Sequence, residues 1–273
     1  MRRLSLLSAL AACGLALAGC AQSGSANDAA SDQSAAMSSS SAAESAPVED
    51  ITLNVFAAAS LTETFGALEK TFEAAHPNVD VVLNLAGSQD LVAQMAANGG
   101  ADVLATANES TMDSAKEQGL VEEPAVFVKN TLTLITPPGN PAGVTGLDSS
   151  LDNAKLVICA PEVPCGKLTK KLTVALGVEL HPVSEEQAVT DVRGKVASDE
   201  ADAGIVYKTD ALAEGEKVET VDIQGAEQAV NTYPIAVAAG TSHADSAKAW
   251  VDLVLSAEGQ KVLEAAGFTP AAR

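Results

Sequence analysis

Two serines follow two predicted strands at equivalent places, and they are the residues of this chain best placed to bind a ligand. Ser60 comes after the run ITLNVFAAA, and Ser88 comes after VDVVLNLAG. The small residues 57–59 and Gly87 leave space in front of each hydroxyl. Ligands of open α/β sheets bind outside the carboxyl ends of the strands, which meet at one edge. We therefore expect both hydroxyls and nearby backbone amides to face one ligand.

The helices predicted after these serines make an anion the expected ligand. Helix N-termini carry unpaired N–H groups and a positive dipole end, so they hold an anion without any cationic side chain. Ser60 and Glu63 also fit a capping box, in which the Ser60 hydroxyl would only cap its helix. The sequence is compatible with both roles for Ser60.

Other chemistries lack their residue patterns. His76, His181 and His243 are scattered along the chain and show no metal-ligand spacing. The run before Lys167 is not a phosphate loop, because Pro161 stands where the first glycine must be. No G-x-S-x-G turn occurs in the sequence, so a serine hydrolase would lack its nucleophile turn.

The elements that must position these residues alternate along the chain. From Ile51 onward, extended runs such as ITLNVF and ADVLATA alternate with helical stretches such as LTETFGALEKTFEAAH. This alternation predicts an α/β fold in which mostly parallel sheets are flanked by helices. A long extended run, FVKNTLTLITPPGNP, leads into a second set with KLVICA, helices over about 166–176 and about 186–197, and AGIVY.

The long extended runs predict two lobes joined by two crossover segments. The chain is expected to cross near 131–134 and to return near 231–234. The expected first lobe comprises residues 49–132 and 233–273, and the expected second lobe comprises residues 133–232. The ligand would then bind in a cleft between the lobes.

The N-terminal segment predicts export and tethering. Two arginines precede an apolar run that is too short to span a bilayer comfortably and has the polarity of a secretory signal. The run ends in LAGC, which resembles a bacterial lipobox, so residues 1–19 are expected to be removed and Cys20 to carry a lipid. An ordinary signal peptide cut at a nearby small residue is the alternative. Residues 20–48, rich in Ala and Ser, predict a disordered tether on the outer face of the membrane.

Cys159 and Cys165 lie six residues apart in this exported chain. The spacing favours a structural disulfide that closes the loop APEVP, with free thiols as the alternative. A redox-active pair would need the C-x-x-C spacing that is missing here. A disulfide would make the segment around Cys165 more rigid.

The chain is acidic, with 36 Asp and Glu against 16 Lys and Arg and a net charge of −20. This balance disfavours nucleic acid and anionic membrane surfaces as partners, so membrane contact is expected through the lipid anchor alone. The negative net charge also repels an anionic ligand at long range. Salt screens such charges beyond about 10 Å, however, whereas the donors of a site act in contact.

Five separated motifs, in order, carry a resemblance to a known family. VFAAASLTETF, LAGSQDLVAQM, EVPCGK, TDVRGKV and AGIVYKTDA resemble the periplasmic molybdate-binding proteins of bacterial ABC importers. The resemblance runs from Thr52 through AAGFTP near the C-terminus. It implies a two-lobed periplasmic-binding-protein fold of the type II kind. It also implies a monomer that captures molybdate, and tungstate, and delivers it to an ABC permease, with no cofactor and no enzymatic activity.

The resemblance implies five ligand contacts. AAAS and GS place the hydroxyls of Ser60 and Ser88 on the first lobe. VPCG, DVRG and GIVY place the amides of Cys165 and Val192 and the hydroxyl of Tyr207 on the second. The family more often has alanine at the position of Cys165, but the implied contact uses only the backbone. A proton-free tetrahedral dianion only accepts hydrogen bonds, so these donors suit it, whereas hydrogen phosphate also needs an acceptor.

Several alternatives are compatible with the sequence. The same fold could select tungstate or the smaller sulfate, which cavity size must reject. An extracellular enzyme could use Ser60 or Ser88 as a nucleophile if a base lay beside it, and an adhesin would bind no small anion. Arg193 is expected on the surface or paired with a carboxylate, because adjacent helical residues point in different directions. Lys167 is the nearer cation to the implied site.

Overall fold

The computed structural model describes residues 49–271, and all of them belong to one compact unit. The predicted signal peptide over 1–19, the predicted anchor Cys20 and all of the predicted tether lie outside the described residues. Among residues 49–271, no helix combines the length and the apolar character needed to cross a bilayer.

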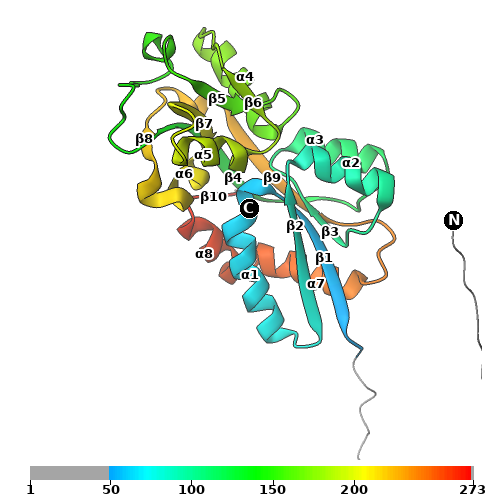
Figure 1. Cartoon of the computed structure of the whole chain (residues 1–273). Helices are drawn as coiled ribbons and strands as arrows, with labels where there is room; N and C mark the ends of the chain where they lie inside the picture. Colours follow the sequence, from blue (N-terminus) through cyan, green and yellow to red (C-terminus); the bar gives the residue numbers. More distant parts are fainter. Residues whose placement is uncertain (1–48, 272–273) are drawn as a thin grey trace, which may run out of the picture. The chain divides into compact units, whose positions relative to one another are not determined.

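Strands and helices alternate through the described residues, as Figure 1 shows. The strands are β1 (Ile51–Ala58), β2 (Val79–Ala86), β3 (Val103–Ala105), β4 (Ala125–Thr136), β5 (Leu156–Cys159), β6 (Ser184–Glu186), β7 (Ala203–Tyr207), β8 (Glu219–Val221), β9 (Val230–Val237) and β10 (Thr269–Pro270). The helices are α1 (Thr62–Ala75), α2 (Ser88–Asn98), α3 (Glu109–Glu117), α4 (Pro164–Leu176), α5 (Val189–Ala197), α6 (Lys208–Glu214), α7 (Ala244–Leu255) and α8 (Ala257–Ala265). A short 3₁₀ turn, η1 (Ala59–Leu61), joins β1 to α1.

The strands follow the order β2-β1-β3-β9-β4-β7-β5-β6, with β8 and β10 paired to β4. Strand β1 runs parallel to β2 and β3, and β5 runs parallel to β6 and β7. The two long strands β4 and β9 are antiparallel to their neighbours. The predicted α/β class is confirmed, and each outer set of three strands is parallel within a mixed sheet.

Strand β4 is shared by two sections of this sheet. Residues 125–131 pair with β9, and residues from Leu132 onward pair with β7 and β8. We call β1, β2, β3, β9 and residues 125–131, with the helices α1, α2, α3, α7 and α8, the first section. The rest of β4, with β5 to β8 and α4 to α6, is the second section. The chain returns to the first section before Val230, which pairs with Thr131.

Alternate residues of β1 anchor two separate helix layers on the first section. Val55 belongs to a buried cluster that includes Phe65 and Phe72 of α1 and Trp250 of α7. The Trp250 ring meets Phe65 and Phe72 edge-on, at centroid distances of 5.6 and 5.4 Å. Phe56, on the opposite face, belongs to a cluster under α2 and α3. Because burying each such side chain contributes about 1.5–3 kcal/mol, this packing fixes the strand ends that carry the serines.

The helices α4 and α5 of the second section begin at other residues than the sequence predicted. The predicted helix over 186–197 was wrong at its start, because residues 184–186 form the edge strand β6 and α5 begins at Val189. Glu186 pairs with Cys159 in a parallel ladder and forms an ion pair with Lys195. Such pairing outweighs local propensity in a short segment. Helix α4 begins at Pro164 rather than near Gly166.

Candidate functional site

A small cavity lies where the two sections meet. Its walls come from both sections: Ala58, Ala59, Ser60, Ala86, Gly87, Ser88, Ala107, Val163, Pro164, Cys165, Val189 and Tyr207. The centre of a water-sized sphere can move through only about 10 Å³ of it. That is close to the least space that holds one water molecule. None of these described lining residues has a charged side chain. A ligand larger than one water molecule fits here only when the two walls move apart.

The first turns of three helices face this cavity. Ser88 is the first residue of α2, Cys165 the second of α4 and Val189 the first of α5, and all three line it. The first N–H groups of a helix have no partner within it, and Pro164 begins α4 at a position where the missing N–H costs nothing. The positive ends of three helix dipoles therefore meet at one point, which favours an anion.

Ser60 does not cap helix α1, so the capping-box interpretation was wrong. It lies inside the 3₁₀ turn η1, and α1 begins at Thr62 with no side-chain cap. The Ser60 hydroxyl is instead 3.0 Å from the hydroxyl of Tyr233. The extra 3₁₀ turn moves the serine out of the cap position and onto the cavity wall. When Tyr233 donates, Ser60 keeps its own proton for a ligand.

Two further hydroxyls at the cavity also accept a hydrogen bond from the protein. The backbone N–H of Ala107 donates to Ser88 Oγ at 3.0 Å. The side-chain amide of Asn231 donates to the Tyr207 hydroxyl at 2.7 Å. Each hydroxyl has one proton, which is left for another acceptor. Both side chains are almost fully buried, so the Ser88 proton can be used by an acceptor in the cavity, and the Tyr207 proton by such an acceptor or by the neighbouring Tyr233 hydroxyl.

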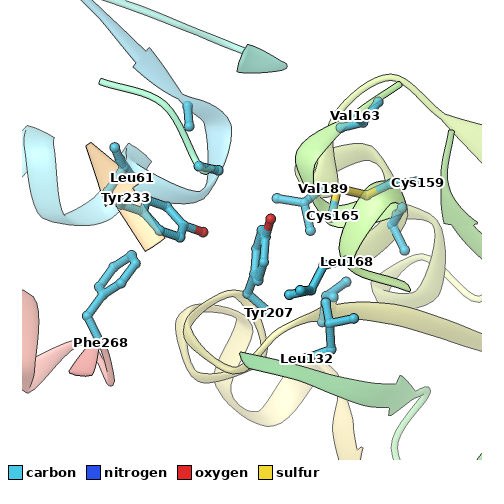
Figure 2. Packing of buried hydrophobic residues seen from close by; sticks show 14 of the residues in the cluster. Leu61, Leu132, Cys159, Val163, Cys165, Leu168, Val189, Tyr207, Tyr233 and Phe268 are labelled. Atoms are coloured by element: carbon cyan, nitrogen blue, oxygen red, sulfur yellow. A yellow bond between two sulfur atoms is a disulfide. The ribbon is translucent and has the colours of Figure 1, made fainter. Parts of the chain in front are cut away.

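The two tyrosines remain protonated. Burial raises the pKa of Tyr207 well above its usual range, and the neighbouring Tyr233 raises it further, while the hydrogen bond from Asn231 lowers it. Burial likewise raises the pKa of Tyr233 far above its usual range. Figure 2 shows the two hydroxyls facing one another across the gap between the sections, with Val189 and Cys165 beside Tyr207. Tyr207 can therefore donate at any pH at which the protein works.

The nearby cations are engaged elsewhere. Arg193 contacts Glu63 at 2.7 Å, Glu214 at 3.1 Å and Asp210 at 3.7 Å, which confirms the predicted carboxylate pairing although its side chain is only 11% exposed. Burial would lower the Arg193 pKa, but the bond to Glu63 and the neighbouring carboxylates raise it overall. Burial raises the pKa of Asp210 to about 7 despite the opposing charge of Arg193. Lys167 Nζ lies 3.5 Å from Ser110 Oγ, outside the cavity lining.

Cys159 and Cys165 form a disulfide, with their Cα atoms 5.7 Å apart. It joins the end of β5 to the first turn of α4, the turn that lines the cavity. The backbone of Gly166 packs closely against the residue that follows this strand. A Cβ at position 166 would lie only 1.9 Å from the carbonyl oxygen of Ala160, so only glycine fits there. The amide of Cys165 is thus held by a covalent bond on one side and by close backbone packing on the other.

The structure brings four of the five predicted contact residues to one cavity: Ser60, Ser88, Cys165 and Tyr207. The fifth, Val192, is fully buried one turn further along α5 and is not among the lining residues, so its role stays a prediction. The sequence reasoning missed Val189 of the same helix, and it missed Tyr233 and Asn231, which contact the site hydroxyls from β9. An asparagine inside a strand-like run was the only signal available for Asn231.

Among the described residues, no histidine lines this cavity. Within residues 49–271, no group of three or more His, Cys, Asp or Glu side chains is arranged to hold a metal ion. His243 lies 3.3 Å from Asp102, and His76 stacks on Phe72. Neither histidine lines the cavity.

Comparison with known proteins places the chain in a family. Residues 53–269 match the model of the bacterial extracellular solute-binding proteins. The molybdate-binding protein ModA of Mycobacterium tuberculosis is 40% identical over 216 residues, which cover 78% of this chain and 83% of that protein. This relative confirms the resemblance that the motifs indicated.

Two solved structures share the fold. The periplasmic molybdate-binding protein of Azotobacter vinelandii has a TM-score of 0.71 at 18% identity, covering 81% of this chain and all of that chain. The sulfate-binding protein SubI of Mycobacterium tuberculosis has a TM-score of 0.67 at 20% identity, covering 81% and 87%. The family is one of solute-binding transport proteins, not of enzymes. The chain belongs to the bacterial extracellular solute-binding protein family.

Proposed function

We propose that this protein captures molybdate outside the cell membrane. The observation that carries the proposal is the uncharged cavity onto which three helix N-termini and the hydroxyls of Ser60, Ser88 and Tyr207 converge. A proton-free tetrahedral dianion accepts from every one of these donors and has no proton to place. The 40% identity to a molybdate-binding protein supports the same ligand.

The anion binds first to Ser60 and Ser88 on the first section, and the second section then closes over it. We assign the contacts from the second section to the amides of Cys165 and Val192 and to the hydroxyl of Tyr207. The moving lobes are residues 49–132 with 233–273, and residues 133–232. Closure is a hinge motion, and it is favoured by contacts that exist only in the closed state.

Three contacts between the sections support this closure. Arg193 of α5 bonds Glu63 of α1, and Lys167 of α4 reaches Ser110 of α3. The side chain of Gln89 on α2 donates to the backbone carbonyl of Gln187 at 3.1 Å. Each would break when the sections separate, so together they stabilise the closed form around the ligand.

The proposal extends to delivery. A closed, loaded monomer is recognised by an ABC import permease, and the protein is held at the outer face of the membrane by lipid on Cys20 and the tether of residues 20–48. Tungstate binds the same site, since it is also a proton-free tetrahedral dianion. Sulfate is the nearest alternative ligand, because a sulfate-binding protein shares the fold.

Isothermal titration with molybdate, tungstate, sulfate and hydrogen phosphate tests the ligand. We expect tight binding of the first two, binding of sulfate weaker by at least about 100-fold, and the weakest binding for hydrogen phosphate, which needs an acceptor that the site lacks. Tight sulfate binding with weak molybdate binding would mean that the ligand is sulfate and not molybdate. Labelling of Ser60 or Ser88 by a fluorophosphonate, without binding of any anion, would instead favour a serine-dependent enzyme.

A further inference from the structure

Asn231 is a buried polar residue at the start of β9 that contacts two walls of the cavity. Its side-chain amide donates to the Tyr207 hydroxyl at 2.7 Å and to the backbone carbonyl of Pro164 at 3.3 Å. Only 8% of Asn231 is exposed. An amide NH₂ group has two protons, and these two contacts use both. Tyr207 and Pro164 line the cavity themselves, whereas Asn231 does not.

The contact with Asn231 fixes the direction of the Tyr207 proton. The amide nitrogen can only donate, so the phenol oxygen accepts in this bond and its single proton must point elsewhere. The neighbouring Tyr233 hydroxyl is hydrogen-bonded to Tyr207 and can accept this proton, so an anion in the cavity competes with Tyr233 for it. In Figure 2 the Tyr207 hydroxyl lies between the Tyr233 hydroxyl and the side chains of Val189 and Cys165, and Val189 and Cys165 line the cavity. Asn231 thereby makes the Tyr207 hydroxyl a donor, either to Tyr233 or to a ligand in the cavity.

We propose that Asn231 is a positioning residue for ligand selection: it holds the Tyr207 hydroxyl as a donor toward a proton-free oxyanion, and it fixes the start of α4 through Pro164. The inference rests on the proposed function, in which Tyr207 contacts the anion. Without Asn231 the hydroxyl can rotate and present a lone pair to the ligand, which repels an anion. The cost to binding should therefore depend on the presence of the Tyr207 hydroxyl.

A double-mutant cycle on the full chain tests this dependence. The variants are Asn231→Leu, Tyr207→Phe and the two combined, and molybdate affinity is measured by isothermal titration. We expect Asn231→Leu to weaken binding about 10-fold when Tyr207 is present and less than about 2-fold when residue 207 is phenylalanine, because a hydrogen bond to a charged partner is lost only in the first case. Asn231→Ala provides the same cycle with a smaller side chain if the leucine variant does not fold.

Thr133 offers a control. It is a buried polar residue of β4 whose hydroxyl donates to the backbone carbonyl of Val221 at 3.2 Å, and it does not line the cavity. Thr133→Val should lower stability and change binding by the same factor with or without the Tyr207 hydroxyl. A structural role for Asn231 would give that same result, so equal effects of Asn231→Leu in both backgrounds overturn the inference. If the wild-type protein binds no molybdate, the proposed function fails instead.

Discussion

The two sections of the sheet hold their ligand donors in different ways. On the first section, the hydroxyls of Ser60 and Ser88 are set by Tyr233 and by the backbone of Ala107, all within that section. On the second section, the amide of Cys165 is set by a disulfide, and the hydroxyl of Tyr207 is bonded by Asn231 at the start of β9, where the chain crosses back to the first section. The first half of the site is thus complete alone, and the second half depends on a covalent link and on the crossover segment.

This difference assigns an order to binding. A section whose donors are preorganised can take the anion first at little entropic cost. The second section reaches the anion only on closure, so its donors act last. Substitutions on the first section should therefore reduce the initial capture of the ligand, and substitutions at the boundary should reduce closure.

Ser88→Ala should have the largest effect. It removes a donor to a charged ligand and leaves the buried N–H of Ala107 without its partner, so molybdate affinity should fall about 100-fold. Isothermal titration measures the change. The exposed Ser114→Ala variant on α3 is the control and should bind like the wild type. An affinity within about 2-fold of the wild type would remove Ser88 from the site.

Gly87→Ala should weaken binding about 10-fold by blocking closure. A Cβ at Gly87 would lie 2.4 Å from the backbone carbonyl of Gln187, which belongs to the other section, and 2.4 Å from the side-chain amide of Gln89, which is flexible and can move away. The backbone at Gly87 has φ −58°, which suits any residue, so the first section should fold normally. Gly66→Ala on α1, where a Cβ meets nothing within 4 Å, is the matched control. Unchanged affinity would mean that the sections do not approach this closely when loaded.

Replacing both Cys159 and Cys165 by serine should act on the second section alone. Loss of the cross-link should lower the free energy of unfolding by about 2 kcal/mol for so short a loop. Molybdate affinity should fall by only about 5-fold, because packing around Gly166 still places the amide at position 165. Urea unfolding and titration measure the two effects. A loss of molybdate affinity as large as that of Ser88→Ala would contradict the proposed difference between the two sections.

Glu63→Gln should have the smallest effect, about 2- to 3-fold weaker binding. The Glu63 carboxylate is 45% exposed and bonds Arg193 across the boundary, so it contributes little beyond stabilising the closed form. The loss should appear as faster release of molybdate in stopped-flow kinetics and should shrink at high salt. Asp252→Asn, which breaks the exposed pair with Lys248 within α7, should change nothing.

The sequence predicted the fold well where patterns are local. The alternation of strands and helices, and the serines after β1 and β2, follow from periodicity and from the small residues around Ser60 and Ser88. The strand β6 was missed because it depends on pairing with β5, which is distant in sequence. The 3₁₀ turn η1 was missed because no local pattern distinguishes it from the first turn of α1.

The candidate site was predictable only in its directly contacting residues. Motif resemblance pointed to Ser60, Ser88, Cys165 and Tyr207, which the structure brings to one cavity. The residues that orient them come from distant parts of the chain, and no local pattern links Asn231 to Tyr207. The pairing of β9 with β4 and the packing of the second section against it create that contact.

A crystal structure of the protein grown with molybdate, with the metal located by its anomalous signal, tests the central claim most directly. The account predicts one metal position in the cavity between the sections, with oxygens about 2.7–3.1 Å from the hydroxyls of Ser60, Ser88 and Tyr207 and from the amide of Cys165. A metal bound elsewhere, or held mainly by a lysine or arginine side chain, would contradict it.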